Sequence, residues 1–259
     1  MQWRIDLTDA RMEALLTAMT RAGWQAAPFE RDRQQTAQQY VFAPNSKGDA
    51  FVRALKSLPL GAAVYAGAPP QEGMEVIKAR ALQWHNMLED ECYALQNAAL
   101  TAEGALALAI QSTPRTLRGM PILLLGYGRI GQPLAAQLQA LGARVHILIR
   151  DPVKREKARV AGFYALPDLL SLSQSQAIYP LTLNTAPAPV LDARHAHLFA
   201  AHSVWIELAS SPGGLSDALA FPGKQISAPG LPGAVSPQSA GESIYDYLKR
   251  YAPLSPSNP

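Results

Sequence analysis

Apolar and polar positions alternate with two different periods along the first hundred residues. Short apolar runs typical of strands are separated by longer stretches in which apolar residues recur at helical spacing. Strands that alternate with helices indicate a parallel sheet covered by helices. The pattern predicts strands at residues 3–7, 40–43 and 62–66, helices at 9–22, 49–58 and 71–81, and a weaker element at 84–88.

A second series of the same kind begins after residue 120. Gly142 and Gly162 end its first two helices, as glycine commonly does. The final stretch, residues 253–259, is rich in proline and serine and is expected to fray. The pattern predicts strands at 122–125, 145–149, 178–183, 204–208 and 225–227, and helices at 132–141, 152–161 and about 239–251.

The segment between the two series consists almost wholly of small or apolar residues. Residues 101–112 have the sequence TAEGALALAIQS, and Pro114 ends the helix that they predict. A helix with so few polar positions is expected to be buried. We therefore expect it to connect two α/β domains, residues 1–100 and 101–259, with the last helix packed near their junction.

The composition is typical of a globular protein. Of the 259 residues, 48% are apolar and 17% are charged, which provides enough apolar surface for sizeable cores. The apolar runs fall far short of the roughly 18 residues that a membrane span needs. The N-terminal residues lack the apolar core of a secretory signal, so a cytoplasmic location is expected. A single cysteine, Cys92, excludes an internal disulfide, and no Cys/His cluster indicates a metal site.

The net charge of +3 is small, but the cations are unevenly distributed. Most of the excess lies in the second half of the chain, which favours an anionic ligand there. The cluster lacks interleaved aromatic residues, so it does not indicate a nucleic-acid-binding face. The clustered cations are Arg144, Arg150, Lys154, Arg155, Lys157 and Arg159.

A glycine-rich motif directly follows the predicted strand at residues 122–125. Residues 126–131 have the sequence GYGRIG and stand immediately before a predicted helix. In this context Gly126 permits a tight turn, Gly128 lets a pyrophosphate approach the backbone, and Gly131 lets the helix pack closely on the strand. A purely structural glycine turn is the alternative, and Arg129 is either a phosphate contact or a solvated side chain. The predicted cofactor-binding residues of this turn are Gly126, Tyr127, Gly128, Arg129, Ile130 and Gly131.

The next predicted strand is followed by a cation. Arg150 lies nineteen residues after Gly131, where an NAD-binding fold offers an Asp or Glu to the ribose hydroxyls. Lys154 and Arg155 lie one turn further on, and all three suit the 2′-phosphate of NADP. NADP is therefore favoured over NAD. The alternative is that Asp151 takes the ribose position and restores an NAD site.

Five blocks in the second part of the chain resemble the family of the dipicolinate synthase A subunit, in the same order. They are TAEGALALAIQSTPRTLRG before the strand, GYGRIG in the turn, NTAP after the fourth strand, ELASSPGG after the fifth, and APGLPGAVSPQSAGE near the end. The blocks cover roughly the last 160 residues. The first 95 residues match only in their α/β pattern and lack the glycine-rich first turn of the family.

The resemblance implies a Rossmann-type NAD(P)-binding domain in residues 101–259 and a smaller flavodoxin-like α/β domain in residues 1–100 for substrate or partner binding. It implies the oxidation of a dihydrodipicolinate-type cyclic dicarboxylate to dipicolinate, with hydride transfer to a nicotinamide cofactor, as in spore formation (sporulation). It also implies a partner, a flavoprotein-like B subunit. Aromatisation drives such a reaction, so the protein mainly has to align the ring and hold two carboxylates.

The matched blocks also suggest residues for binding. Asn184, Thr185 and Pro187 would contact the cofactor, with Asn184 bonding a ribose or carboxamide and Pro187 shaping the nicotinamide pocket, whereas a plain turn is the alternative. Glu103 is a base or, preferably, a structural cap. Ordinary capping is as good an explanation for the serines near the last helix. The candidate substrate-binding residues are Asn97, Thr101, Glu103, Ser210, Ser211, Gly230, Ser236, Gln238 and Ser239.

Two positions depart from the family. Ser211 and Gln238 stand where the family has cations able to clamp carboxylates, so the substrate, the catalytic residue and the oligomeric state stay open. A 2-hydroxyacid dehydrogenase is one alternative, but it needs a late catalytic histidine, and none follows His202. His195, His197 and His202 are expected to be solvated. A cofactor-binding regulatory or scaffold protein without turnover is the other alternative.

Overall fold

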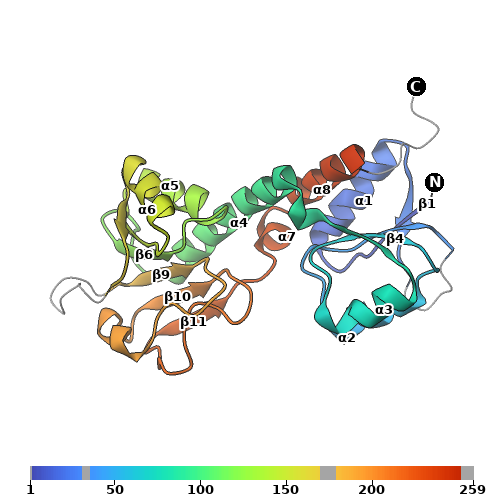
Figure 1. Cartoon of the computed structure of the whole chain (residues 1–259). Helices are drawn as coiled ribbons and strands as arrows, with labels where there is room; N and C mark the ends of the chain where they lie inside the picture. Colours follow the sequence, from blue (N-terminus) through green and yellow to red (C-terminus); the bar gives the residue numbers. More distant parts are fainter. Residues whose placement is uncertain (1, 31–35, 170–178, 252–259) are drawn as a thin grey trace. The chain divides into compact units, whose positions relative to one another are not determined.

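The computed structural model describes residues 2–30, 36–169 and 179–251 and contains two compact units (Figure 1). The first unit comprises Met1–Leu100 together with the chain from Pro232 onwards, and the second comprises Thr101–Leu231. The sequence instead predicts that residues 232–259 belong to the second domain. The difference arises because the last helix packs on the first helix of the chain, an association that no local pattern announces.

The first unit contains a parallel sheet of five strands in the order β2-β1-β3-β4-β5. This order is that of flavodoxin-like folds, as the sequence predicts for this part of the chain. Its strands are β1 (Gln2–Ile5), β2 (Gln25–Pro28), β3 (Gln39–Val41), β4 (Ala63–Ala66) and β5 (Gln83–Asn86). Its helices are α1 (Ala10–Arg21), α2 (Asp49–Ser57), α3 (Met74–Ala79) and α8 (Pro237–Tyr251), with short 3-10 turns at η1 (Gln71–Gly73) and η2 (Met87–Glu89).

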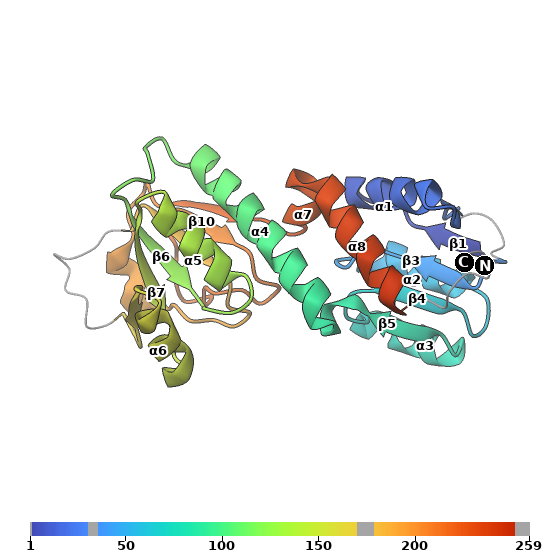
Figure 2. The same ribbon diagram turned by 90° about the horizontal axis from the view of Figure 1, so that it is seen from above.

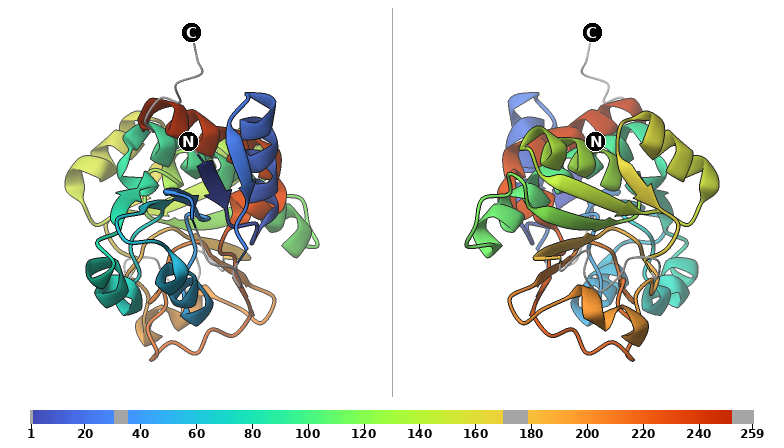
Figure 3. Two further views of the ribbon diagram at one scale, coloured as in Figure 1. Left: turned by 90° about the vertical axis from the view of Figure 1, so that its right-hand side faces the viewer. Right: turned by 90° about the vertical axis from the view of Figure 1, so that its left-hand side faces the viewer.

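Helices cover both faces of this sheet, with α1 and α8 on one side and α2 and α3 on the other (Figure 3, left). Alternate residues of one strand therefore point into different cores. Val41 belongs to the cluster with Met12 and Ile244, whereas Tyr40 and Phe42 belong to the cluster with the second helix pair. Close approach of α8 to α1 requires Gly241, because a Cβ there would lie 2.6 Å from the Arg11 carbonyl oxygen.

The second unit contains a parallel sheet of six strands in the order β11-β10-β9-β6-β7-β8. Numbered within the unit, this is the usual order of the Rossmann fold. Its strands are β6 (Pro121–Leu125), β7 (Arg144–Leu148), β8 (Tyr164–Leu166), β9 (Leu181–Asn184), β10 (Val204–Glu207) and β11 (Lys224–Ser227). Its helices are α5 (Gly131–Ala140), α6 (Pro152–Val160) and the turn η3 (Ala193–Leu198), while α4 (Glu91–Ser112) and α7 (Leu231–Val235) span the division between the units.

The central strand β6 is buried on both faces, which explains its unbroken apolar sequence. Ile122 and Leu124 pack with residues of α4 and α5, which lie on one side of the sheet (Figure 2). Leu123 and Leu125 belong to the opposite cluster, with Trp205. The second sheet is thus packed on both faces, and this packing fixes the positions of its strand ends.

Several boundaries differ from the predictions. The sequence does not predict the strands β2 and β8, because both are short and lie at a sheet edge, where their alternation is weak. The connector helix begins at Glu91 rather than at residue 101. The strand expected at 178–183 is β9, and residue 178 lies outside the described residues, as does the tail 253–259. Within the described ranges, no helix combines the length and apolarity needed to cross a membrane.

Candidate functional site

The order of the second sheet reverses between β6 and β9, and the loops that follow these two strands meet there. Leu125 pairs with Asn184 at the carboxyl ends of the strands. The Leu125 carbonyl oxygen accepts hydrogen bonds from the Thr185 amide at 2.9 Å and the Thr185 hydroxyl at 2.8 Å. Ligands of open α/β sheets bind at such a reversal point, outside the carboxyl ends of the strands.

The glycine turn occupies one side of this point. Gly126 has φ +94°, and a Cβ on Gly131 would lie only 2.5 Å from the Gly126 carbonyl oxygen, so both positions require glycine. A Cβ on Gly128 would meet no atom within 4 Å, so space is left over the backbone. In the described part of the chain, no side chain caps the start of α5 at Ile130. Helical amides next to open space fit a pyrophosphate.

The side chains of the turn contribute less to this space than the sequence suggests. Tyr127 is buried, and its ring packs against Phe163 with centroids 5.9 Å apart. Burial raises the pKa of its hydroxyl. Only the backbone of Tyr127 therefore belongs to the loop surface, whereas Arg129 is exposed.

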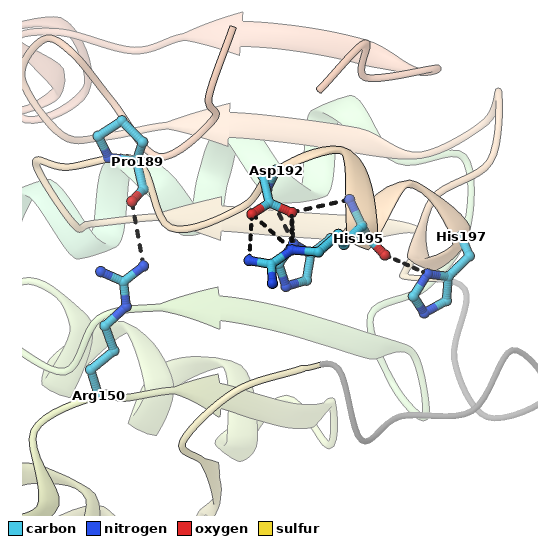
Figure 4. A network of polar contacts seen from close by, with 6 residues as sticks. Arg150, Pro189, Asp192, His195 and His197 are labelled. Carbon is cyan, nitrogen blue, oxygen red and sulfur yellow. Dashed lines mark hydrogen bonds and ion pairs between the residues drawn. The ribbon is translucent and has the colours of Figure 1, made fainter. Parts of the chain in front are cut away.

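The loop after β7 separates the roles of Arg150 and Asp151. Asp151 caps α6 and accepts a hydrogen bond from the Lys154 amide at 2.9 Å, which holds the pKa of its carboxyl below the usual value. Arg150 is exposed and donates to the Pro189 carbonyl oxygen at 3.4 Å (Figure 4). A guanidinium has five N–H donors, so this contact leaves others available. Arg150 thus lies between the loops after β7 and β9.

The neighbouring cations differ in what they do. Arg155 donates to the carbonyl oxygens of Ile149 and Arg150, both at 3.1 Å, and so fixes the backbone that carries Arg150. The Lys154 side chain is exposed. Arg155 is therefore in part a positioning residue, while Lys154 and Arg150 present their charges to solvent.

Asn184 does not point into the cofactor space, contrary to the prediction. It is fully buried, and its amide donates to the Glu207 carboxylate at 2.6 Å and to the Ala186 carbonyl oxygen at 2.9 Å. Its Oδ1 accepts from the Ala186 amide at 3.0 Å. The alternative, a structural turn, thus describes Asn184 better, whereas Pro187 is exposed on the loop surface.

Glu207, at the end of β10, organises the loop that contains Ser210 and Ser211. Its carboxylate accepts hydrogen bonds from Asn184, from the Trp205 indole at 3.2 Å, and from the amides of Ala209 and Gly214, both at 3.0 Å. Both serines are exposed on this loop. Sequence analysis missed this role of Glu207, because its partners lie up to 23 residues away and become neighbours only in the sheet.

A cavity of about 470 Å³ opens beside the same loop, between β10, β11 and the residues after Pro212. Glu207 and Asp217 line it, together with Ser216, whose buried hydroxyl has no hydrogen-bond partner among the described residues. Neither lysine nor arginine lines the cavity in the described part of the chain. It is therefore unsuited to a dianion.

The other candidate substrate residues are distributed over both units. Asn97 belongs to the first unit, and Thr101 and Glu103 to the second, all on α4. Glu103 lies within the helix and is exposed, so it does not cap it, contrary to the preferred prediction. Gly230 precedes α7, Ser236 lies between α7 and α8, and Gln238 and Ser239 are exposed in the first turn of α8.

Comparison with known proteins finds a relative in sequence and several in structure. The chain is 31% identical over 167 residues to the A subunit of dipicolinate synthase from Bacillus subtilis (strain 168), which is 63% of this chain and 56% of that protein. The resemblance to the dipicolinate synthase A subunit is confirmed. The alignment spans little more than half the length of that relative. No protein-family model matches the sequence.

Solved structures support the fold. The chain superposes on the A subunit of dipicolinate synthase from Bacillus halodurans with a TM-score of 0.79, at 23% identity and over 96% of both chains. An L-alanine dehydrogenase superposes with a TM-score of 0.71 at 13% identity, over 97% of this chain and 88% of that one. These likenesses support an α/β fold built on two parallel sheets.

The late histidines have structural rather than catalytic surroundings. His195 is buried rather than solvated, and it forms a capping box with Asp192 at η3. The Arg194 guanidinium, 2.7 Å from Asp192, lowers the pKa of that carboxyl (Figure 4). The Nδ1 of His197 lies 2.9 Å from the Arg194 carbonyl oxygen, and His202 is exposed. His195 and His197 therefore belong to a structural turn.

Proposed function

We propose that this chain is a nicotinamide-dependent oxidoreductase that binds NADP at the β6/β9 reversal point and oxidises a dihydrodipicolinate-type dicarboxylate to dipicolinate. The observation that carries the proposal is the glycine turn, where the open space over Gly128 adjoins the uncapped start of α5. The sequence similarity to the dipicolinate synthase A subunit supports the substrate class.

The disposition of charges supports NADP over NAD. An NAD site needs a carboxylate free to accept the ribose hydroxyls, but Asp151 is engaged as the cap of α6. Arg150 offers its remaining donors beside the same strand end, and Lys154 adds a second exposed cation. Both charges suit a 2′-phosphate, while Arg155 holds the strand end in place.

The reaction breaks two C–H or N–H bonds of the dihydropyridine ring. One hydrogen leaves as a hydride and the other as a proton, and the ring becomes aromatic. When bound, the nicotinamide accepts the hydride, and the proton leaves to water or to the protein. The backbone amides of the glycine turn would hold the phosphates, and Glu207 fixes the loop after β10 through the amides of Ala209 and Gly214. Positioning of this kind is the main contribution a protein can make to a reaction driven by aromatisation.

The test is to incubate the purified full chain with NADP or NAD and freshly generated dihydrodipicolinate, with and without a flavoprotein-like B subunit, and to follow dipicolinate formation. NADP reduction in step with dipicolinate is the expected result. Absence of both NADP binding and turnover in every arm would contradict the proposal.

A second candidate is a cofactor-binding regulatory protein without turnover. The observation that favours it is the loss of cations around the loop after β10, where Ser211 is exposed and the adjacent cavity is lined by carboxylates. Tight NADP binding together with no dipicolinate in any arm of the same experiment would identify this function.

A further inference from the structure

The last residues of five strands lie in one row across the second sheet. Leu148 of β7 is paired with Leu125 of β6, which is paired with Asn184 of β9. Asn184 is paired with Glu207 of β10, and Glu207 with Ser227 of β11 (Figure 1). Neighbouring strands are about 4.8 Å apart, so the row from Leu148 to Glu207 is about 14 Å long. The glycine turn that follows Leu125 thus has strand ends on both sides.

A dinucleotide bound at this turn extends along the row in both directions, because its pyrophosphate joins two nucleosides. The proposed place of the adenosine is beside Arg150, two residues after Leu148. The nicotinamide half then runs the other way, towards the ends of β9 and β10. The cavity of about 470 Å³ lies on that side, since Glu207 and Ser227 line it. All of these elements belong to the second unit.

The lining of this cavity carries negative charge that no cation of the lining offsets. Glu207 accepts hydrogen bonds from a side-chain amide, an indole and two backbone amides, all of which are uncharged. These donors fix the carboxylate without neutralising it. The side chain of Asp217 is exposed and has neither a hydrogen bond nor an ion pair among the described residues. Two carboxylate charges therefore belong to the same small space.

An organic cation suits this lining better than a metal ion does. Groups of three metal-ligating side chains do not occur among the described residues. Apolar side chains complete the walls, as is typical of sites for organic ligands. The buried hydroxyl of Ser216 has no partner in the described ranges, which is expected where a ligand supplies the missing hydrogen bond. The apolar lining includes Trp205, Pro212, Leu215 and Leu219.

We propose that this cavity receives the nicotinamide ring, and that the carboxylates of Glu207 and Asp217 favour its oxidised, cationic form over the neutral, reduced form. The inference rests on the proposed function and adds to it a preference for one redox state. Hydride transfer adds two electrons and one proton to the ring and cancels its positive charge. The attraction to the two carboxylates is then lost, so NADPH leaves more readily than NADP⁺.

The experiment is calorimetric titration of the full chain with NADP⁺ and with NADPH at low salt, where charges are least screened. The measured quantity is the ratio of the Kd for NADPH to the Kd for NADP⁺. Both forms carry the same phosphates, so the ratio isolates the ring. The ratio of the wild type should exceed one. Asp217→Asn should lower it about three- to tenfold, the effect of one charge several ångströms away, and Asp217→Lys about tenfold to a hundredfold.

Glu156→Gln is the matched control, because Glu156 is also exposed in the second unit but lies on α6 and does not line the cavity. It should leave the ratio within twofold of the wild type. If circular dichroism shows that Asp217→Asn is misfolded, Asp217→Ser decides, with the same expected fall.

A ratio for the Asp217 variants within twofold of the wild type would overturn the nicotinamide site, as would a wild type that binds NADPH more tightly than NADP⁺. In both cases the proposed cofactor function still stands, because the cofactor binds. Failure of the wild type to bind either form would overturn the inference and the proposed function together.

Discussion

The carboxylate of Asp151 accepts a hydrogen bond from the Lys154 backbone amide at 2.9 Å and is therefore the cap of α6. This contact assigns the two adjacent charged residues after β7 to different tasks. Asp151 stabilises the helix, and Arg150 is left at the surface between two strand-end loops. In the proposed cofactor site, the choice between NADP and NAD should then depend mainly on Arg150.

Arg150→Asp should invert cofactor preference. NADP affinity should fall by roughly tenfold to a hundredfold, because a charge-assisted contact is worth about 1.5 to 3 kcal/mol. NAD affinity should hold or rise, since the new carboxylate can accept the ribose hydroxyls. A fluorescence titration measures both. Lys157→Asp makes the same change of charge on an exposed position of α6 and should alter NADP affinity much less. Equal affinity of the wild type for NAD and NADP would refute this assignment.

Gly128→Ala and Gly131→Ala should separate cofactor binding from folding. A methyl group on Gly128 meets no protein atom within 4 Å, so the melting temperature should stay within about 2 °C. NADP affinity should nevertheless fall at least about tenfold, because the methyl group fills the space expected for the pyrophosphate. Gly131→Ala places a Cβ 2.5 Å from the Gly126 carbonyl oxygen and should lower the melting temperature by several degrees. Unchanged NADP affinity in folded Gly128→Ala would contradict the proposed cofactor site.

Glu207→Gln should destabilise the second unit. Two donors face each carboxylate oxygen, so the new –NH₂ group must face two donors whichever way the amide is turned. Leaving buried groups unsatisfied costs about 1 to 3 kcal/mol, which a urea titration followed by far-UV circular dichroism would detect. Glu156→Gln, on the exposed surface of α6, should cost less than about 0.5 kcal/mol. Equal stability of the two variants would show that Glu207 does not organise the loop.

Asp90 should make the first unit sensitive to acid. Burial opposes its ionisation, but hydrogen bonds from Tyr251, the Tyr93 amide and Arg250 outweigh this effect, and its pKa lies below the usual value. Ionised Asp90 therefore stabilises the fold above the unfolded-chain pKa of about 3.9, and this contribution is lost as pH falls through the folded pKa. The stability difference between wild type and Asp90→Asn should shrink from pH 6 to pH 3 in urea titrations.

Tyr251→Phe provides the graded control for that measurement. It keeps the aromatic ring and removes one of the donors to Asp90, the hydroxyl at 2.7 Å. The pH dependence should fall between those of the wild type and Asp90→Asn. A stability difference that is the same at both pH values would mean that the contacts of Asp90 do not favour its ionised form.

The glycine turn was predictable from sequence because strand, turn and helix are consecutive, and each glycine has a local steric reason. Asn184 and Glu207 were not assigned correctly, because their roles depend on a hydrogen bond between adjacent strands that are 23 residues apart in sequence. The hydrogen bond that the buried Arg11 guanidinium donates to Asn45 was missed for a similar reason. Asn45 lies 34 residues away in sequence and meets Arg11 only when β1 and β3 pair.

The placement of α8 also determines when the first core can form. Ile244, Tyr247 and Leu248 belong to the same hydrophobic cluster as Trp3, Ile5 and Met12. Residues near both ends of the described chain therefore form a single core. During synthesis the first hundred residues leave the ribosome with this apolar face uncovered, and it stays uncovered while the whole second unit is made. The second unit, Thr101–Leu231, is continuous and can close earlier. A ribosome-bound intermediate of this protein should therefore expose this apolar face of its first unit to chaperones until α8 has left the ribosome.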